Sequence, residues 1–205
     1  PAYAPAGRQE ACLELINLFK QKLFDVYAQS FDTFTIDEGW DDKNTLWDLR
    51  KDRFPKGFHP LSEPLRAMHA AQGLWLSPSS GYGHAPWGKQ AGYEQNSNTW
   101  FLCQSGPKYR QDITRVVTDL AKEYQMTFFK FYGFCASCDA PGHGHLPGEY
   151  AKEANIDAFI ELMQAVRQGR PNVFLDPTCG IWRSPWWLQY ADALWGDVSG
   201  DYPDI

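Results

Sequence analysis

Short strand-like runs alternate with longer amphipathic helix patterns along this chain, and that order limits the folds it can adopt. Aromatic, aliphatic and β-branched residues predict strands at 32–37, 73–78, 127–134, 172–176 and 193–195. Apolar residues at helical spacing predict helices at 8–28, 61–71, 108–124, 152–168 and 184–191. Alternation of this kind predicts parallel strands joined by right-handed helical crossovers.

The first helix pattern also predicts its own buried face. Its apolar residues recur every three or four positions, as expected for a stripe packed on a core. The residues of this stripe are Leu13, Ile16, Phe19, Leu23 and Val26.

About five strands are fewer than the eight of a complete barrel, which takes about 250 residues, and the chain has 205. We therefore predict an α/β fold, an incomplete (β/α)8 TIM barrel. Residues 1–205 are expected to form a single catalytic-type barrel domain that is truncated at both ends. A doubly wound open sheet is the alternative. No Gly-rich phosphate loop follows any predicted strand, which disfavours a nucleotide-binding fold.

Charge and hydropathy exclude some partners. The net charge is −6 and no basic stripe is present, so nucleic acid is not expected as a partner. No apolar run approaches the roughly 18 residues of a membrane helix, so no membrane association is expected. Nine Trp and ten Tyr suit a sugar-binding cleft, although a Trp-rich core explains the same composition. The compartment and the oligomeric state stay open.

Cysteine and histidine give no complete metal-site pattern in the sequence. Cys135 and Cys138 form a C-x-x-C pair, but no second pair accompanies them among the five cysteines. A passive loop pair is therefore expected. His143 and His145 flank a glycine, and exposed loop histidines are favoured over metal ligands, with a hydrogen-bonding role at a cleft rim as a further alternative. Neither a metal nor a cofactor is predicted.

The strand-like run 127–134 carries a residue that does not suit a buried strand. Lys130 lies among aromatic residues, and a buried ammonium needs a partner, normally a carboxylate. The alternative is a lysine on an edge strand that faces solvent. Carboxylates that follow predicted strands are Asp37, Glu38, Asp176, Asp197 and Asp201. Each of them alone also suits a helix cap or a solvated loop.

The end of this strand, Lys130-Phe131-Tyr132-Gly133, resembles a motif of the α-galactosidase-like clan of retaining glycoside hydrolases, which includes glycoside hydrolase family 36. The motif there is Lys-aromatic-Asp-Gly, and its Asp is the catalytic nucleophile. Tyr132 stands in that place here. The segment 199–201 is similar to the region of the acid/base Asp. The resemblance therefore implies catalytic positions at Tyr132 and Asp201, with Asp197 as the alternative acid.

Further segments carry the same resemblance in the same order, over about residues 30–204. The run 36–40 is similar to an Asp-Asp-Gly-Trp strand end whose acids hold sugar hydroxyls, and 73–76 is similar to a strand whose Trp packs against the sugar. Around Cys179 the chain resembles a strand end that faces the sugar's second carbon. The substrate-binding residues implied in this way are Asp37, Glu38, Trp40, Trp75, Lys130 and Cys179.

These observations leave three hypotheses open. The first is a glycoside hydrolase-like protein for α-galactoside-type sugars with a retaining two-carboxylate mechanism, inactivated because Tyr132 replaces the nucleophile. The second is a non-catalytic carbohydrate-binding relative. The third is a single-residue variant of an active enzyme, since one base change converts Asp to Tyr. Tyrosine nucleophiles do occur in sialidases, so residual activity stays open. Each hypothesis implies a carbohydrate as the partner.

Overall fold

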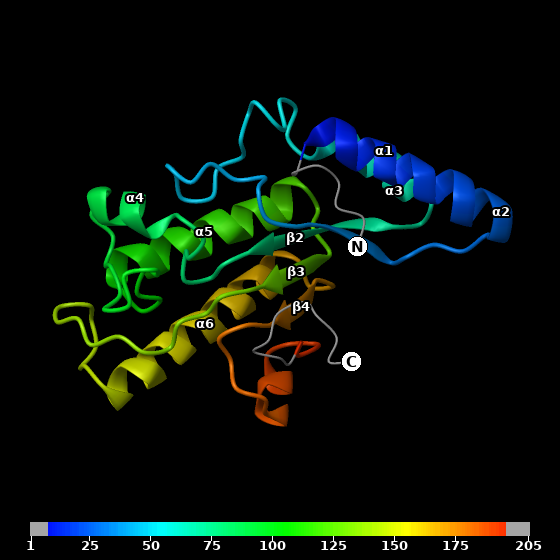
Figure 1. The fold of residues 1–205 in the computed structure, drawn as a ribbon. Coiled ribbons are helices and arrows are strands. Elements are labelled where there is room, and N and C mark those ends of the chain that lie inside the picture. Colours follow the sequence, from blue (N-terminus) through cyan, green and yellow to red (C-terminus); the bar gives the residue numbers. More distant parts are fainter. Residues whose placement is uncertain (1–7, 196–205) are drawn as a thin grey trace, which may run out of the picture.

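A parallel four-stranded sheet forms the middle of the computed structural model, which describes residues 8–195. Its strands are β1 (Thr33–Ile36), β2 (Ala71–Leu76), β3 (Phe128–Phe131) and β4 (Phe174–Pro177). They lie side by side in chain order, and each neighbouring pair is parallel (Figure 1). A doubly wound sheet reverses its strand order at a switch point, whereas a barrel wall does not. The predicted α/β fold is confirmed as a partial barrel wall.

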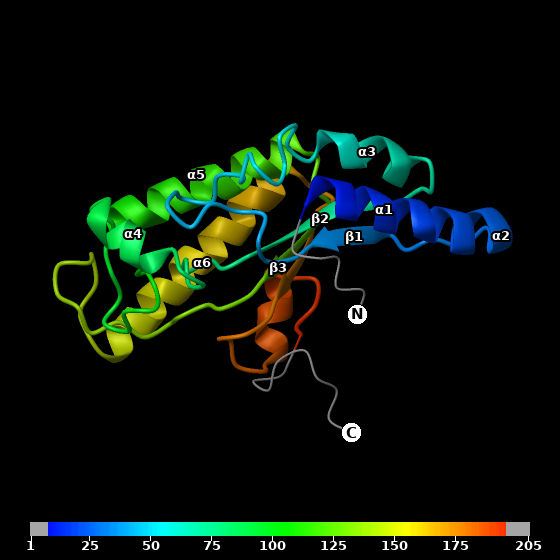
Figure 2. The same ribbon diagram turned by 45° about the horizontal axis from the view of Figure 1, so that its top comes forward.

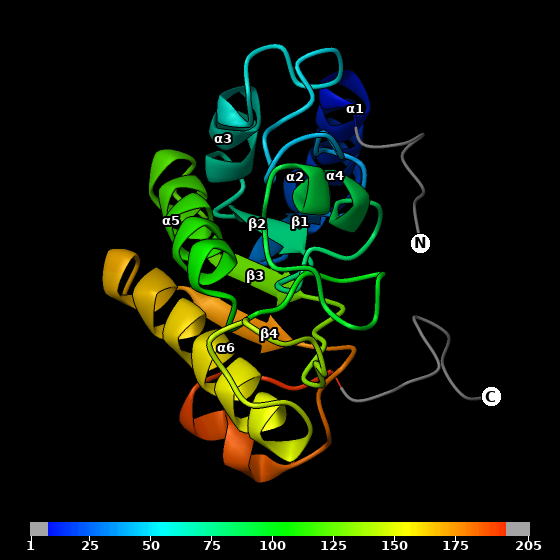
Figure 3. The same cartoon turned by 90° about the vertical axis from the view of Figure 1, so that its left-hand side faces the viewer.

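Helices cover one side of this sheet. The helical elements are α1 (Gln9–Phe19), a π-helical segment (Lys20–Phe24), α2 (Asp25–Tyr27), α3 (His59–Arg66), α4 (Ala85–Gln90), α5 (Pro107–Glu123), α6 (Glu149–Gly169) and a 3₁₀ helix (Pro185–Gln189). In Figure 3, α3, α5 and α6 lie on the same side of the strands. Figure 2 shows α5 and α6 side by side. The other side of the sheet carries the candidate site.

Helix α5 shows how local sequence sets one of these elements. Tyr109, Ile113 and Val117 are fully buried at four-residue spacing, so one stripe of the helix faces the core. Pro107 occupies the first turn, where its missing N–H costs nothing. The carboxylate of Glu94 accepts hydrogen bonds from the backbone N–H groups of Lys108 and Tyr109, at 3.1 and 3.0 Å. The helix therefore begins where the sequence pattern predicts.

Two expectations about elements are wrong. The first helical region buries only Ile16 of its predicted stripe, and Val26 is 61% exposed. The π-helical segment shifts the turn at Lys20–Phe24, so later residues leave the stripe, and the region extends beyond the sheet (Figure 1). Residues 193–195 form no strand. Instead the N–H of Trp195 donates to Asp176 at 3.1 Å.

The ends of β3 and β4 are tied together by backbone contacts. The N–H groups of Gly133 and Phe134 both donate to the carbonyl of Cys179 at 3.0 Å. Gly180 follows with φ +96°, and a Cβ there would lie 1.8 Å from the carbonyl oxygen of Phe134. Only glycine fits at this position, because a side chain would be strained and would also force the two backbones apart.

We predict that Gly180→Ala lowers the free energy of unfolding by about 3 kcal/mol or more, because strain and a backbone clash add. Gly83→Ala is the matched control, since Gly83 has φ +98° but would make only ordinary contacts. It should cost about 1–2 kcal/mol. Urea unfolding measures both. Equal losses for the two variants would contradict the close approach at Gly180.

Candidate functional site

Four side-chain positions form a row across the sheet, on the face away from the main helices. Trp75, Lys130 and Asp176 occupy paired positions on β2, β3 and β4. Asp37 follows Ile36, which pairs with Leu74, so it extends the row beside Trp75. Residues in register on parallel strands point to the same face. The row lies at the carboxyl ends of the strands, where barrel proteins gather their functional residues.

Lys130 is the centre of this row. It is 7% exposed, and its Nζ lies 3.5 Å from Oδ2 of Asp37. The ammonium also lies over the rings of Trp195 and Tyr132, 4.6 and 5.6 Å from their centroids. The predicted carboxylate partner is confirmed. The alternative of an edge-strand lysine is wrong, because β3 lies between β2 and β4.

Asp176 is a second carboxyl group near Lys130, and it is 7% exposed. Burial raises its pKa above the usual range, although the N–H of Trp195 and the charge of Lys130 act in the opposite direction. The sequence identified Asp176 only as one of several strand-end acids. Its register with Lys130 is the signal that distinguishes it from the others.

Aromatic rings enclose the row beyond the end of β3. Tyr132 is half-buried, and its ring lies 6.4 Å from that of Trp75 and 5.7 Å from that of Tyr82. Burial, followed by the charge and hydrogen bond of Tyr132, raises the pKa of the Tyr82 phenol. Sequence reasoning missed Tyr82, because it lies in a long loop without a motif. Tyr132 thus shares one site with Lys130, but its catalytic role stays a prediction.

The two tryptophans predicted to bind substrate are buried. Trp40 has no exposed surface, packs against Trp47 and Phe58, and donates from Nε1 to the carbonyl of Trp75 at 2.9 Å. The prediction that Trp40 contacts a ligand is wrong in this arrangement, because core side chains cover it completely. Trp75 is 2% exposed and lies beneath Tyr82 and Tyr132. The prediction that Trp75 packs against a sugar is therefore also wrong in this arrangement, because neighbouring rings cover it.

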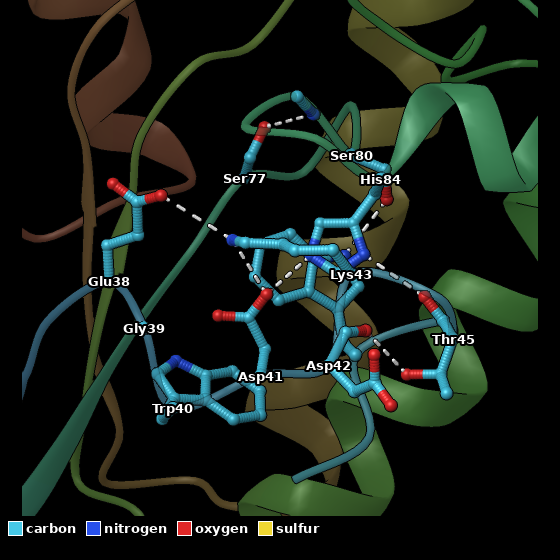
Figure 4. A network of polar contacts seen from close by, with 12 residues as sticks. Glu38, Gly39, Trp40, Asp41, Asp42, Lys43, Thr45, Ser77, Ser80 and His84 are labelled. Atoms are coloured by element: carbon cyan, nitrogen blue, oxygen red, sulfur yellow. Dashed lines mark hydrogen bonds and ion pairs between the residues drawn. The ribbon is translucent and has the colours of Figure 1, made fainter. Parts of the chain in front are cut away.

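Glu38 and its neighbours form a charged network beside the row (Figure 4). Lys43 contacts Glu38 at 3.5 Å and Asp41 at 2.8 Å. Asp41 is buried, and its Oδ2 lies 2.6 Å from Nε2 of His84, whose Nδ1 lies 3.0 Å from the carbonyl of Thr45. Burial raises the pKa of Asp41, but the contacts with His84 and Lys43 outweigh it and lower the pKa to about 2.

The remaining predicted site residues are Cys179, Asp197 and Asp201. Cys179 is half-buried and holds the β3 end through its carbonyl, while a role for its thiol stays a prediction. Asp197 and Asp201 lie outside the described residues. Within residues 8–195, no helix is long and apolar enough to cross a membrane.

The loop cysteines and histidines are arranged differently from the sequence expectation. His143 and His145 are half-buried, so the expectation of exposed loop histidines is wrong. Cys138 lies near His143, but Cys135 of the same C-x-x-C pair does not join them. The second cysteine near the two histidines is Cys103, which comes from a different loop. No local motif links Cys103 to the others, because 35 positions separate it from Cys138.

Comparisons with solved structures find a similar fold in α-galactosidases, including members of glycoside hydrolase family 36. The α-galactosidase AgaB from Geobacillus stearothermophilus gives a TM-score of 0.72 at 16% identity, covering 97% of this chain and 29% of that one. A variant of AgaA from the same organism, in complex with 1-deoxygalactonojirimycin, gives 0.71 at 15% identity, covering 97% and 30%. The α-galactosidase from Lactobacillus brevis gives 0.69 at 17% identity, covering 96% and 29%.

These likenesses concern the fold, because the identities are low. The chain spans about 30% of the length of the structures that it matches. No family model matches the sequence, and no curated protein matches it either.

We predict that Lys130→Met raises the pKa of Asp176 further, because the ammonium is one of the two groups that lower it. Lys43→Met is the control, since Lys43 contacts Asp41 and Glu38 instead. Carboxyl-carbon NMR titration of the two variants measures the effect. An unchanged Asp176 titration in Lys130→Met would show that the two groups do not interact.

Asp41 should make stability depend on acid pH. Its folded pKa of about 2 lies below the ordinary aspartate pKa of 3.8, so its contribution to stability is complete above about pH 4 and is lost as pH falls toward 2. Asp41→Asn should cost about 2 kcal/mol at pH 7 and flatten this part of the stability curve. Asp52→Asn removes an exposed carboxylate and should change little. Urea unfolding at pH 2–7 tests this, and parallel curves for wild type and Asp41→Asn would contradict it.

Proposed function

We propose that this chain is part of a glycoside hydrolase-like protein that binds α-galactoside-type sugars at the carboxyl ends of the strands. The observation that carries the proposal is the gathering of Asp37, Lys130, Asp176 and Tyr132 on one face at that end of the sheet. Barrel enzymes hold their substrates at this end. The fold neighbours include α-galactosidases, one of them in complex with 1-deoxygalactonojirimycin, which supports a carbohydrate ligand.

The polar groups of the row suit sugar hydroxyls. The carboxylate of Asp37 is 62% exposed, so its two oxygens are able to accept hydrogen bonds from neighbouring hydroxyl groups. Lys130 supplies donors from a nearly buried position, where competition from water is small. The ring of Tyr132 adds an apolar surface beside them. Together they form an acceptor, a donor and an aromatic wall, which is the chemistry of a sugar subsite.

Tyr132 decides what such a site does with a bound sugar. The two-carboxylate mechanism of retaining hydrolysis uses a carboxylate nucleophile and a second carboxyl group about 5–5.5 Å away. A phenol with an ordinary pKa of about 10 attacks poorly unless a strong base removes its proton. The phenol of Tyr82 next to it is itself hard to deprotonate. We therefore propose that the protein is inactive, or nearly so, as a retaining glycosidase, with Asp201 as the remaining acid.

A non-catalytic carbohydrate-binding relative is the second candidate. The contacts of Tyr132 with Tyr82 and Trp75 favour it, because they build Tyr132 into the wall of the site. Both candidates bind sugar, and they differ in whether a carboxylate at position 132 restores turnover.

The test compares the complete protein with its Tyr132→Asp and Tyr132→Asn variants on an aryl α-galactoside. We expect Tyr132→Asp to hydrolyse this substrate about 10³-fold faster than the unaltered protein, because it regains a nucleophile. Tyr132→Asn is the matched control: it opens the same space without a carboxylate and should stay inactive. Adding Asp201→Asn to the Tyr132→Asp variant should abolish the activity.

Each outcome separates the candidates. If calorimetry detects galactoside binding by all variants but none turns over, the binding relative is favoured. If the unaltered protein is as fast as Tyr132→Asp, position 132 is not the nucleophile position. If none of the proteins binds or hydrolyses the sugar, the carbohydrate proposal fails.

A further inference from the structure

Two cysteines and two histidines meet away from the strand row, on the loops that follow β2 and β3. Each of Cys103, Cys138, His143 and His145 offers one ligand atom, and these atoms all lie within 4.8 Å of one another. Both cysteines are fully buried and both histidines are half-buried. Nε2 of His145 lies 3.2 Å from the Sγ of Cys103, and Nδ1 of His143 lies 3.5 Å from the Sγ of Cys138. One nitrogen of each imidazole therefore faces a sulfur atom.

The pairing of β2 with β3 brings the four residues together. Cys103 belongs to the loop between α4 and α5, in the connection that follows β2, and the other three belong to the loop between β3 and α6. Both loops lie near the ends of α5 and α6 where those helices begin (Figure 1). Asn155 of α6 is buried between them. It accepts from the N–H of Ser105 at 2.8 Å and donates to the carbonyl of Ala136 at 2.7 Å.

The backbone around the histidines fixes their orientation. Nδ1 of His145 lies 2.9 Å from the carbonyl of Leu146, so this nitrogen carries the proton and donates it. In the neutral imidazole with this tautomer, Nε2, the nitrogen that faces Cys103, carries the lone pair. Most metal-binding histidines are oriented in this way, because the ring nitrogen that does not bind the metal donates a hydrogen bond to a carbonyl, carboxylate or water. Gly144 lies between the two histidines with φ +80°, which lets both rings turn toward the cysteines.

We propose that Cys103, Cys138, His143 and His145 bind one zinc ion in a closed tetrahedral site. Zinc bonds of about 2.3 Å to sulfur and about 2.0–2.1 Å to nitrogen separate ligand atoms by about 3.3–3.8 Å. The observed cluster needs only a small contraction to reach those distances. Two thiolates balance the charge of the ion, which suits a buried position. The absence of carboxylates from this set disfavours calcium and magnesium, which take oxygen ligands.

Four protein ligands leave no open position, so the ion is structural and not catalytic. It joins the α4–α5 loop to the β3–α6 loop, which are also linked by hydrogen bonds from Asn96 to Ser137 and from Asp139 to Ser97. The zinc proposal does not rest on the proposed sugar site.

A disulfide between Cys103 and Cys138 is the rival arrangement. The structure has both as free thiols, and a disulfide would leave the two imidazoles facing sulfurs without a proton or charge to bind. Cys135 gives a matched control within the same loop. Its Sγ faces the side-chain amide of Asn96 at 3.6 Å and the carbonyl of Ser137 at 3.5 Å, outside the cluster.

The first experiment measures metal in the full-length protein purified without chelator, by plasma mass spectrometry. We expect the zinc content to fall by about one ion per chain in each of Cys103→Ser, Cys138→Ser, His143→Asn and His145→Asn, since each removes one of four ligands. Cys135→Ser should retain the wild-type content. Equal zinc in all five variants, or none in any protein after zinc is supplied, would overturn the proposal.

A second measurement does not depend on variants that may fold poorly. Cobalt replaces zinc in the chelator-treated wild-type protein, and a tetrahedral site with thiolate ligands gives intense visible bands and sulfur-to-metal charge-transfer absorption. Competition with zinc should remove these bands. His145→Asn should weaken cobalt binding more than about 100-fold, beyond the 10–100-fold typical of outer-shell changes. Absence of thiolate charge-transfer absorption would overturn the proposal.

Alkylation followed by peptide mass spectrometry separates zinc from a disulfide. A zinc site predicts that Cys103 and Cys138 react in unfolding buffer after chelator alone, without a reductant. If both residues react only after a reductant is added, they form a disulfide and the zinc proposal is wrong.

Discussion

A buried ammonium in the middle of a parallel sheet is the constraint on which the site and the strand register both depend. Lys130 is 7% exposed, so it needs opposite charge from neighbouring strands. The register supplies Asp176 beside it on β4 and Asp37 one strand beyond Trp75. A slip of one residue would turn Lys130 toward the helices and turn Phe129 away from them. Charge pairing on one face and apolar packing on the other therefore select the same register.

The sequence predicts the parts of the fold that local periodicity encodes. The positions of α5 and α6 and the order of four parallel strands follow from apolar spacing and helix–strand alternation. Periodicity fails at Lys20–Phe24, where a π-helical segment changes the residues per turn. It also fails at 193–195, because these residues hold Asp176 through a backbone N–H and not through a strand ladder. Such contacts between distant segments have no local sequence pattern.

The candidate site also has residues that the sequence predicts and residues that it does not. Lys130 and its acid partner are predictable, because a charge in an apolar run requires a counter-charge. Trp40 shows the limit of arguing from residue type, since the same indole suits a sugar-binding wall or a core, and packing against Trp47 and Phe58 places it in the core. The aromatic content of the loop 79–105 suits a cleft wall, but no motif singles out Tyr82 within it. Its place over Trp75 depends on the course of a loop that only tertiary contacts determine.

The two clusters of this structure lie on the same pair of connections between strand and helix. Tyr82 and Cys103 lie on either side of α4 in the connection from β2 to α5, and Tyr132 begins the β3–α6 loop that carries the other three ligands of the proposed zinc site. Loops of this length have many conformations in isolation, so ordering them is costly. A metal ion that joins them far from the sheet would limit their freedom along their whole length. The contact between Tyr82 and Tyr132 would then depend on two anchors, the strand ends at one side and the Cys/His cluster at the other.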